Sequence, residues 1–181
     1  MTLADLEARF AQVSTDRTLN PDQRFGLLAC REALAAATKG NYGVGAVLVN
    51  PQGEVVEQGQ NSVFFPHFRS DLHAEMAVMN SFEDRHPATE HMRGYTLISS
   101  LEPCPMCLAR LLVAGVQVVK FLAYDDLAGM VRQIHQFPSA WRRLWQRQDF
   151  VLADVSDDLR RFALDVFLFN LDMCRQKLLA R

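Results

Sequence analysis

The chain lacks the surplus of basic residues that a protein binding duplex nucleic acid usually carries. It has 19 lysines and arginines against 21 aspartates and glutamates, and its formal net charge is -2. This balance excludes a molecule that is basic as a whole, although it allows a local basic patch. We therefore expect a small-molecule partner and no nucleic acid.

The sequence also has no long apolar run, no internal repeat and no low-complexity segment. Its first residues, MTLADLEARFAQV, mix charged and apolar residues at helical spacing, which is not typical of an export signal. We therefore expect no membrane contact and a cytoplasmic location. With 49% hydrophobic residues, the chain suits one domain with a sizeable core. We predict a helical extension at 1–19 with a break at 14–18, a core at 20–155 and a closing helix at 156–181.

Cysteine is scarce, with four residues in the chain: Cys30, Cys104, Cys107 and Cys174. A chain of this size needs no disulfide staples, so reduced thiols are expected. Cys30 and Cys174 lie on apolar helix faces and are predicted to be core residues. Cys104 and Cys107 have the Cys-x-x-Cys spacing, which indicates a metal site or a redox pair.

Alternating strand and helix patterns begin at residue 44 and predict an α/β layered domain. The predicted strands cover residues 44–50, 54–60, 95–100, 117–125 and 149–154. The predicted helices cover residues 3–14, 20–39, 71–84, 104–115 and 157–179. Ser70 or Asp71 is the expected N-cap of the third helix. The last helix is apolar nearly all round, which indicates burial on more than one side.

The two cysteines of PCPMC lie three residues apart at a predicted helix start, so their sulfur atoms share one face. The helix N-terminus favours thiolates, the form that zinc requires. A tetrahedral zinc ion needs two further ligands, and a catalytic zinc ion takes three protein ligands plus water. His73, in LHAEM, is the best third ligand.

Glu75 follows His73 by two residues and suits a proton carrier better than a fourth ligand, since an activated water needs a base close by. A purely structural zinc site would have no use for it. On an ideal helix, however, positions two apart point to different sides. The spacing alone does not bring His73 and Glu75 to one pocket.

The pair of motifs HAE at 73–75 and PCPMC at 103–107 resembles the cytidine/deoxycytidylate deaminase superfamily. VGAVLV at 44–49 is similar to the first strand of that family. SSLEPCPMCLARLL is similar to the matching stretch of tRNA adenosine deaminases and of small zinc guanine deaminases. The resemblance covers roughly residues 22–125.

This resemblance implies one zinc ion held by His73, Cys104 and Cys107. It implies that Glu75 carries a proton from the attacking water to the ring nitrogen and the leaving amine. The implied fold is a three-layer α/β/α domain with a five-stranded mixed sheet, and the two zinc-binding helices lie in the middle of one face. Asn61 matches an asparagine that contacts the substrate base or ribose in many members.

Two further substrate contacts are expected from the residues themselves. Phe64, Phe65 and Phe68 lie in a loop beside the expected pocket, and at least one of them could stack on a flat heterocycle. We select Phe64. Asp125 ends a strand at the edge where α/β sites lie, and it could accept a hydrogen bond from a substrate amine. A helix cap is the competing interpretation for Asp125.

The cluster WRRLWQRQ at 141–148 could face RNA, but an amphipathic helix that docks its tryptophans on the core is favoured. The segment 126–150 could instead wall off the pocket. With the neutral-to-acidic composition, this favours a hydrolase that releases ammonia from a guanine-like purine base. A tRNA adenosine deaminase and a cytosine or cytidine deaminase remain alternatives, and a nucleotide substrate would require phosphate contacts that no motif identifies.

Two interpretations outside the enzyme class also remain. One is an inactive partner subunit with a deaminase fold, which the complete set of His73, Glu75, Cys104 and Cys107 disfavours. The other is a binding module that zinc only stabilises. The broadly apolar helix at 157–179 and the habit of the family both predict a homodimer.

Overall fold

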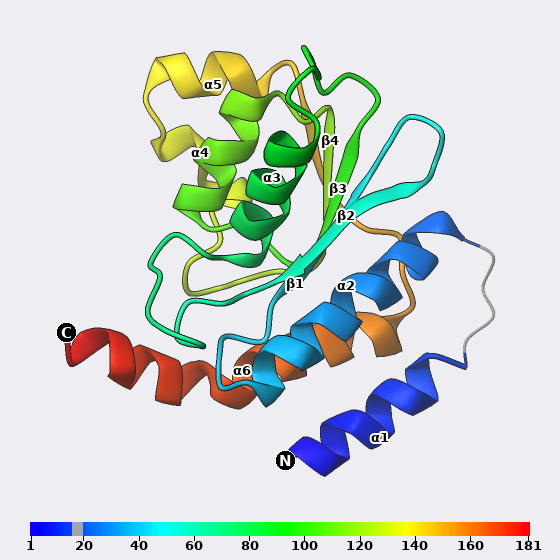
Figure 1. Ribbon diagram of the computed structural model, residues 1–181, viewed down its shortest axis with the longest axis vertical. Helices are drawn as coiled ribbons and strands as arrows, with labels where there is room; N and C mark the ends of the chain where they lie inside the picture. The colour runs from blue at the N-terminus through cyan, green and yellow to red at the C-terminus, as the bar shows by residue number, and fades with distance from the viewer. Residues whose placement is uncertain (16–19) are drawn as a thin grey trace.

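The computed structural model describes residues 1–15 and 20–181 and folds them around one five-stranded sheet (Figure 1). The strands are β1 (Gly45–Val49), β2 (Val55–Gln60), β3 (Thr96–Leu101), β4 (Val118–Ala123) and β5 (Asp149–Leu152). Their order is β2-β1-β3-β4-β5, with β1 antiparallel to β2 and β3, and with β3, β4 and β5 parallel. The mixed sheet predicted from the sequence is confirmed. The break predicted at 14–18 falls largely outside the described residues.

Helices cover both faces of the sheet and complete the three predicted layers (Figure 1). The helices are α1 (Leu3–Val13), α2 (Pro21–Thr38), α3 (Ala74–Arg85), α4 (Pro105–Ala114), α5 (Ser139–Trp145) and α6 (Asp157–Leu179), with a 3-10 helix η1 (Val131–Gln136). Helices α2 and α6 pack on one face, and α3 and α4 on the other. Across the described residues, no helix combines the length and the apolarity needed to cross a bilayer.

Strand β1 lies inside the sheet, and all five of its residues are buried. Such a strand reads as a continuous apolar run, which is how the sequence predicted it. At Gly45 a Cβ atom would stand 2.2 Å from the backbone oxygen of Ala29. The missing side chain therefore lets α2 pack directly on β1.

The third helix begins later than predicted, at Ala74, and its N-cap is His73. The predicted cap at Ser70 or Asp71 is wrong. The carboxylate of Asp71 instead accepts two hydrogen bonds from the Arg69 guanidinium, at 2.9 and 2.8 Å. Backbone hydrogen bonds from the Leu72 N–H to the Arg69 carbonyl and from the Ser62 N–H to the Leu72 carbonyl place these residues in a turn before the helix.

The stretch 126–148 contains η1 and α5, and it packs beside α4. Trp141 and Trp145 lie against a second apolar cluster, in which Trp145 stacks on Phe150 with ring centroids 4.3 Å apart. The predicted docking of these tryptophans on the core is confirmed. The members of the cluster with the least exposure are Leu108, Leu112, Phe121, Met130 and Val131.

Phe162 fixes α6 to the core, since it is fully buried and its ring lies 5.4 Å from that of Phe10. We expect Phe162→Ala to lower the free energy of unfolding by about 3–5 kcal/mol, because it leaves a cavity in a close-packed site. Urea unfolding followed by circular dichroism measures the change. Leu168→Ala, on the exposed side of the same helix, is the control and should cost less than about 1 kcal/mol. Equal losses in both variants would contradict this packing role.

Candidate active site

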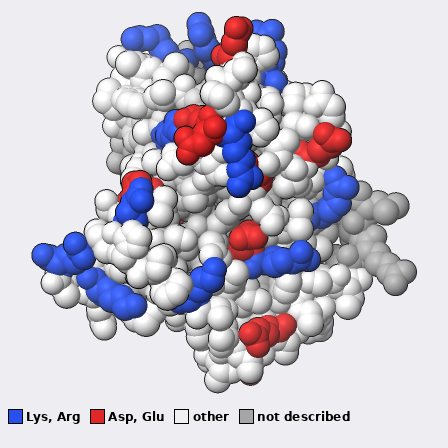
Figure 2. Space-filling view, in the orientation of Figure 1, with Lys and Arg blue, Asp and Glu red and all other residues white. Residues whose placement is uncertain are grey.

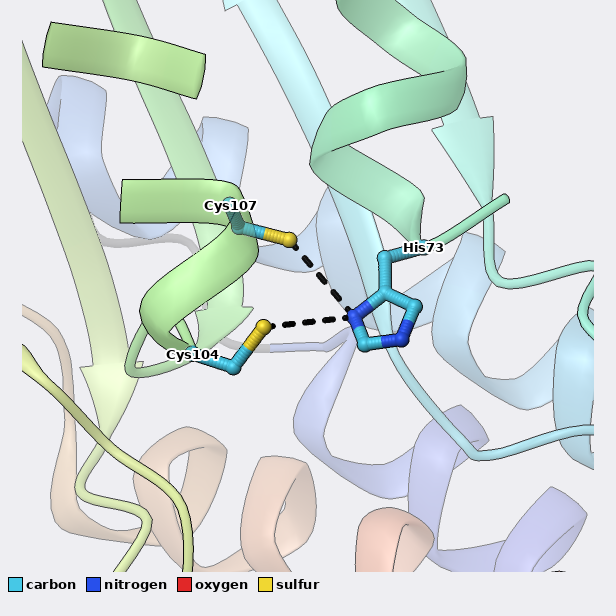
Figure 3. A group of neighbouring side chains, drawn as sticks. All are labelled: His73, Cys104 and Cys107. Atoms are coloured by element: carbon cyan, nitrogen blue, oxygen red, sulfur yellow. Dashed lines mark hydrogen bonds between the residues drawn. The ribbon is translucent and has the colours of Figure 1, made fainter. Parts of the chain in front are cut away.

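Two helix N-termini face each other beside the sheet and carry the predicted metal ligands (Figure 3). His73 is the N-cap of α3 and Cys104 is the N-cap of α4, and both have extended backbone dihedrals. Neither side chain caps its own helix. Pro105 at the first position of α4 suits that start, because its missing N–H would have no partner there. Both side chains thus remain free to point across the gap.

The three predicted ligands converge on one point. The Nδ1 atom of His73 lies 3.5 Å from the Cys104 sulfur and 3.6 Å from the Cys107 sulfur (Figure 3). The ligand atoms of the three residues all lie within 4.8 Å of one another. In a tetrahedral zinc site, bonds of about 2.3 Å to sulfur and 2.0 Å to nitrogen place these atoms about 3.6 Å apart. His73, Cys104 and Cys107 therefore fit one zinc ion.

The surroundings of the two thiols move their pKa values in opposite directions. Hydrogen bonds from Cys107 and from His73 lower the pKa of Cys104 to about 4, although burial opposes this. The same pairing, with burial, raises the pKa of Cys107 well above its usual value. Because zinc binds cysteine as the thiolate, metal binding at this pair releases the protons that the thiols carry.

The structure also answers how His73 and Glu75 reach the same place. His73 stands outside α3 with an extended backbone, whereas Glu75 is in its first turn. The helical spacing that separates positions i and i+2 therefore does not apply to this pair. Both side chains line one cavity.

Glu75 is buried, and burial raises the pKa of its carboxyl group. Its Oε1 accepts a hydrogen bond from the Ser99 hydroxyl at 3.2 Å, and its Oε2 lies 3.4 Å from the Cys107 sulfur. The second oxygen is therefore beside the ligand set. This is where a carboxylate can exchange a proton with a water molecule held at the metal position.

A cavity of about 380 Å³ opens from these ligands. Its walls come from the loop before α3, from the carboxyl ends of β3 and β4 and from the last helix. The lining residues include Tyr42, Asn61, Val63, Phe68, Ser70, Leu101, Glu102, Asp125, Leu127, Ala128, Phe167, Leu171, Arg175 and Leu178. A cavity with apolar walls and a few polar groups is typical of a small-molecule site.

Of the three predicted substrate contacts, the structure brings Asn61 and Asp125 to the cavity wall. Asn61 accepts a hydrogen bond from the Val63 N–H at 3.2 Å, so its Nδ2 group is the part left for a ligand. Phe64 packs between Tyr42 and Phe68, at ring distances of 5.8 and 5.9 Å. The ring that lines the cavity here is that of Phe68.

Helix α6 is the part of the site that sequence reasoning missed. Phe167, Leu171, Arg175 and Leu178 follow helical spacing and line the cavity. The sequence did contain a signal for this wall, because a helix that is apolar nearly all round is expected to be buried on more than one side. The expected wall from 126–150 is limited to Leu127 and Ala128, because most of that segment packs beside α4.

The ligand set generates a direct prediction. Wild-type protein prepared with zinc should hold one zinc ion per chain, and Cys107→Ala should lose it, because two protein ligands do not complete the site. Elemental analysis after dialysis against a weak chelator measures this. Cys30→Ala, at a buried cysteine far from the cluster in sequence, should keep the zinc ion. Zinc retained in Cys107→Ala would contradict the assignment.

Comparisons with known proteins agree with this geometry. The family model described as the cytidine and deoxycytidylate deaminase zinc-binding region matches residues 19–123, more than half of the chain. The tRNA-specific adenosine deaminase of Bacillus subtilis is 35% identical over 111 residues, which cover 61% of this chain and 67% of that protein.

Two solved structures have a similar fold. A structure described as a tRNA:A34 deaminase that performs A-to-I editing at the wobble position is 26% identical, with a TM-score of 0.60 over 72% of this chain and 97% of that chain. The guanine deaminase of Nitrosomonas europaea is 22% identical, with a TM-score of 0.62 over 90% of this chain and 92% of that one, and shares the fold. The chain therefore belongs to the cytidine and deoxycytidylate deaminase family of zinc-dependent hydrolytic deaminases.

Proposed function

We propose that the protein removes the amino group of a free purine base, guanine-like in its pattern of polar groups, and releases ammonia. The observation that carries this proposal is the cavity of about 380 Å³ beside the metal ligands, one wall of which is formed by the chain's own helix α6. A cavity of this size suits a single base, and an amino group bound in it can reach Glu75, which lines the same cavity.

The residues divide the reaction between them. Zinc bound by His73, Cys104 and Cys107 supplies the Lewis acidity that makes water a nucleophile at neutral pH. Glu75 takes one proton from the attacking water and delivers it to the ring nitrogen, and it then carries the second proton of that water to the leaving amine, which departs as ammonia. Its Oε1 is steadied by the Ser99 hydroxyl, so Oε2 stays beside the reacting centre.

The cavity offers both hydrogen-bond types that an amino-substituted ring needs. Asn61 presents an amide N–H group, which can donate to a ring nitrogen or carbonyl. Asp125 presents a carboxylate, which can accept from a ring N–H or an amino group. The apolar side chains of Phe68, Phe167 and Leu171 line the same cavity. Such side chains can pack against a flat heterocyclic ring.

A tRNA adenosine is the second candidate, and two observations favour it. The sequence similarity to tRNA-specific adenosine deaminases is the first. The second is the basic end of α6, where Arg175 lines the cavity, Lys177 lies over the Phe64 ring and Arg181 over the Phe68 ring. In Figure 2, Lys and Arg side chains gather at the lower left, where Figure 1 places the C-terminal end of α6. Such groups can contact phosphates. A cytosine or cytidine substrate is supported by the family description alone.

The substrate is tested by ammonia release from guanine, adenine, cytosine, their nucleosides and a tRNA anticodon stem-loop. We expect release from guanine or a related base, and a decrease of about 10²–10⁴-fold in Glu75→Gln, because that variant cannot carry the proton. Glu83→Gln, at an exposed carboxylate on the same helix, is the matched control, and zinc content is measured in all three proteins. Release from the stem-loop alone would move the assignment to tRNA.

The role of Asn61 is tested with Asn61→Asp. This variant keeps an oxygen for the Val63 N–H but loses the amide N–H group that faces the cavity. We expect KM for the base to rise by roughly tenfold or more, because a buried substrate acceptor loses its donor. Asn50→Asp, in the turn after β1, should leave KM unchanged. An unchanged KM in Asn61→Asp would remove Asn61 from the substrate contacts.

The homodimer and the cytoplasmic location stay predictions from the sequence. So does the expectation of no nucleic-acid partner, which the stem-loop in the substrate panel tests.

A further inference from the structure

We propose that Glu102 and Arg132 form a clamp that sets the position of Asp125 on the cavity wall. Glu102 is then a positioning residue for the reaction. The inference rests on the proposed function, because Asp125 is assigned there as a contact of the substrate.

Glu102 is a carboxylate buried within a ring of hydrogen-bond donors. It follows β3 directly and lies two residues before Cys104, and its side chain is 0% exposed. It accepts hydrogen bonds from the backbone N–H of Asp125 at 3.2 Å and of Arg132 at 3.1 Å, and from Nε of Arg132 at 3.2 Å. One side chain thus fixes both ends of the segment 125–132.

Arg132 closes the clamp from outside. Its Nη2 group lies 3.3 Å from the Asp125 carbonyl oxygen and 2.9 Å from a carboxylate oxygen of Asp126. Its guanidinium also stands 4.3 Å from the centre of the Tyr124 ring. The guanidinium of Arg132 therefore contacts both the segment 124–126 and the buried carboxylate of Glu102.

The segment wraps tightly around Glu102. A Cβ atom at Gly129 would lie 2.3 Å from Oε2 of Glu102 and 2.5 Å from the Asp125 carbonyl oxygen. Only a residue without a side chain fits there, so the path of the backbone is matched to the carboxylate. Leu127 and Ala128, inside this turn, line the cavity.

The consequence reaches the substrate through Asp125. Its Oδ1 accepts from the N–H groups of Leu127 at 2.9 Å and Ala128 at 3.0 Å. Its Oδ2 makes no hydrogen bond among the described residues, and Asp125 lines the cavity. Glu102 thus holds the backbone of Asp125, the turn orients its carboxylate, and Oδ2 is left to accept from an amino group.

Glu102→Gln tests the clamp with almost no change in volume. The amide keeps one acceptor but directs an NH2 group at a site lined with donors, so at least one of the three bonds is lost. We expect KM for the base to rise roughly tenfold or more, with kcat changed less than about threefold and zinc retained. Arg132→Met should act in the same direction.

The matched control is Glu57→Gln. Glu57, on β2, is also a buried carboxylate that pairs with an arginine, Arg85, at 3.1 Å. It is not among the residues that line the cavity. Its variant should lower the melting temperature and leave KM unchanged. Equal changes of KM in Glu57→Gln and Glu102→Gln would overturn the proposal.

A double-mutant cycle shows whether Glu102 acts through Asp125. Asp125→Asn keeps the turn and removes the charge that faces the cavity. If the clamp works by placing that carboxylate, Glu102→Gln should change KM less than about twofold in the Asp125→Asn background. Changes of KM that multiply independently would overturn the proposal.

Hydrogen exchange by mass spectrometry gives a readout that needs no substrate. Glu102→Gln should speed exchange in 124–132, where the N–H groups of Asp125 and Arg132 lose their acceptor, and Glu57→Gln should not. Unchanged exchange in that segment overturns the clamp. If the wild type releases ammonia from no base, the proposed function fails, and the exchange result still decides whether Glu102 holds the segment.

Discussion

The metal site depends on two helices, α3 and α4, whose N-termini face each other. The N-cap side chain of neither helix makes a capping hydrogen bond. His73 and Cys104 occupy N-cap positions. At such a position the side chain of a serine or an aspartate normally accepts a hydrogen bond from an N–H group in the first turn of its own helix. A histidine or cysteine there leaves the free N–H groups of the first turn directed at the gap. The positive ends of two helix dipoles therefore lie beside the sulfur atoms, and the pKa of Cys104, at the very start of α4, is lowered to about 4. The same positions that leave the helix ends open supply the metal ligands.

The sheet fixes where those helix ends meet. Strand β3 is buried along most of its length and runs parallel to β4, so its carboxyl end delivers Glu102, Pro103 and Cys104 to the edge of the sheet. Ligands of α/β proteins gather at such edges because the connections there converge. On the opposite side of the cavity, the last helix lines the wall from Phe167 to Leu178 and stays anchored by the buried Cys174. Residues far apart in the chain thereby line one cavity.

The sequence predicted most of this through short-range patterns. Buried strands, helix starts and the ligand types are all encoded within a few residues. The N-cap of α3 was assigned wrongly because Asp71, a good cap by residue type, pairs with Arg69. The competition between two local hydrogen bonds is not visible in residue preferences. Whether the side chains of His73 and Glu75 reach one cavity also depends on where α3 begins, because His73 lies outside the helix and Glu75 inside it.

The wall formed by α6 could not be derived in this way. Its apolar residues indicate burial, but a helical pattern does not say whether the covering element is a sheet, a second helix or a substrate. The choice between Phe64 and Phe68 fails for a similar reason. Two aromatic rings in one loop differ only in their neighbours, and Tyr42, which receives Phe64, comes from a distant part of the chain. Long-range packing decides both cases.

Three carboxyl groups line the cavity, and their partners separate their roles. Glu102 has its oxygen atoms covered by N–H groups and a guanidinium, so it is committed to holding the chain. Asp125 has one oxygen committed to a turn and one open to the cavity. Glu75 has the Ser99 hydroxyl and the Cys107 thiol beside its oxygen atoms, and burial raises the pKa of its carboxyl group. Of the three, Glu75 is the buried carboxyl group that lies beside the metal ligands and has a raised pKa, so it is the group placed to take up and release a proton.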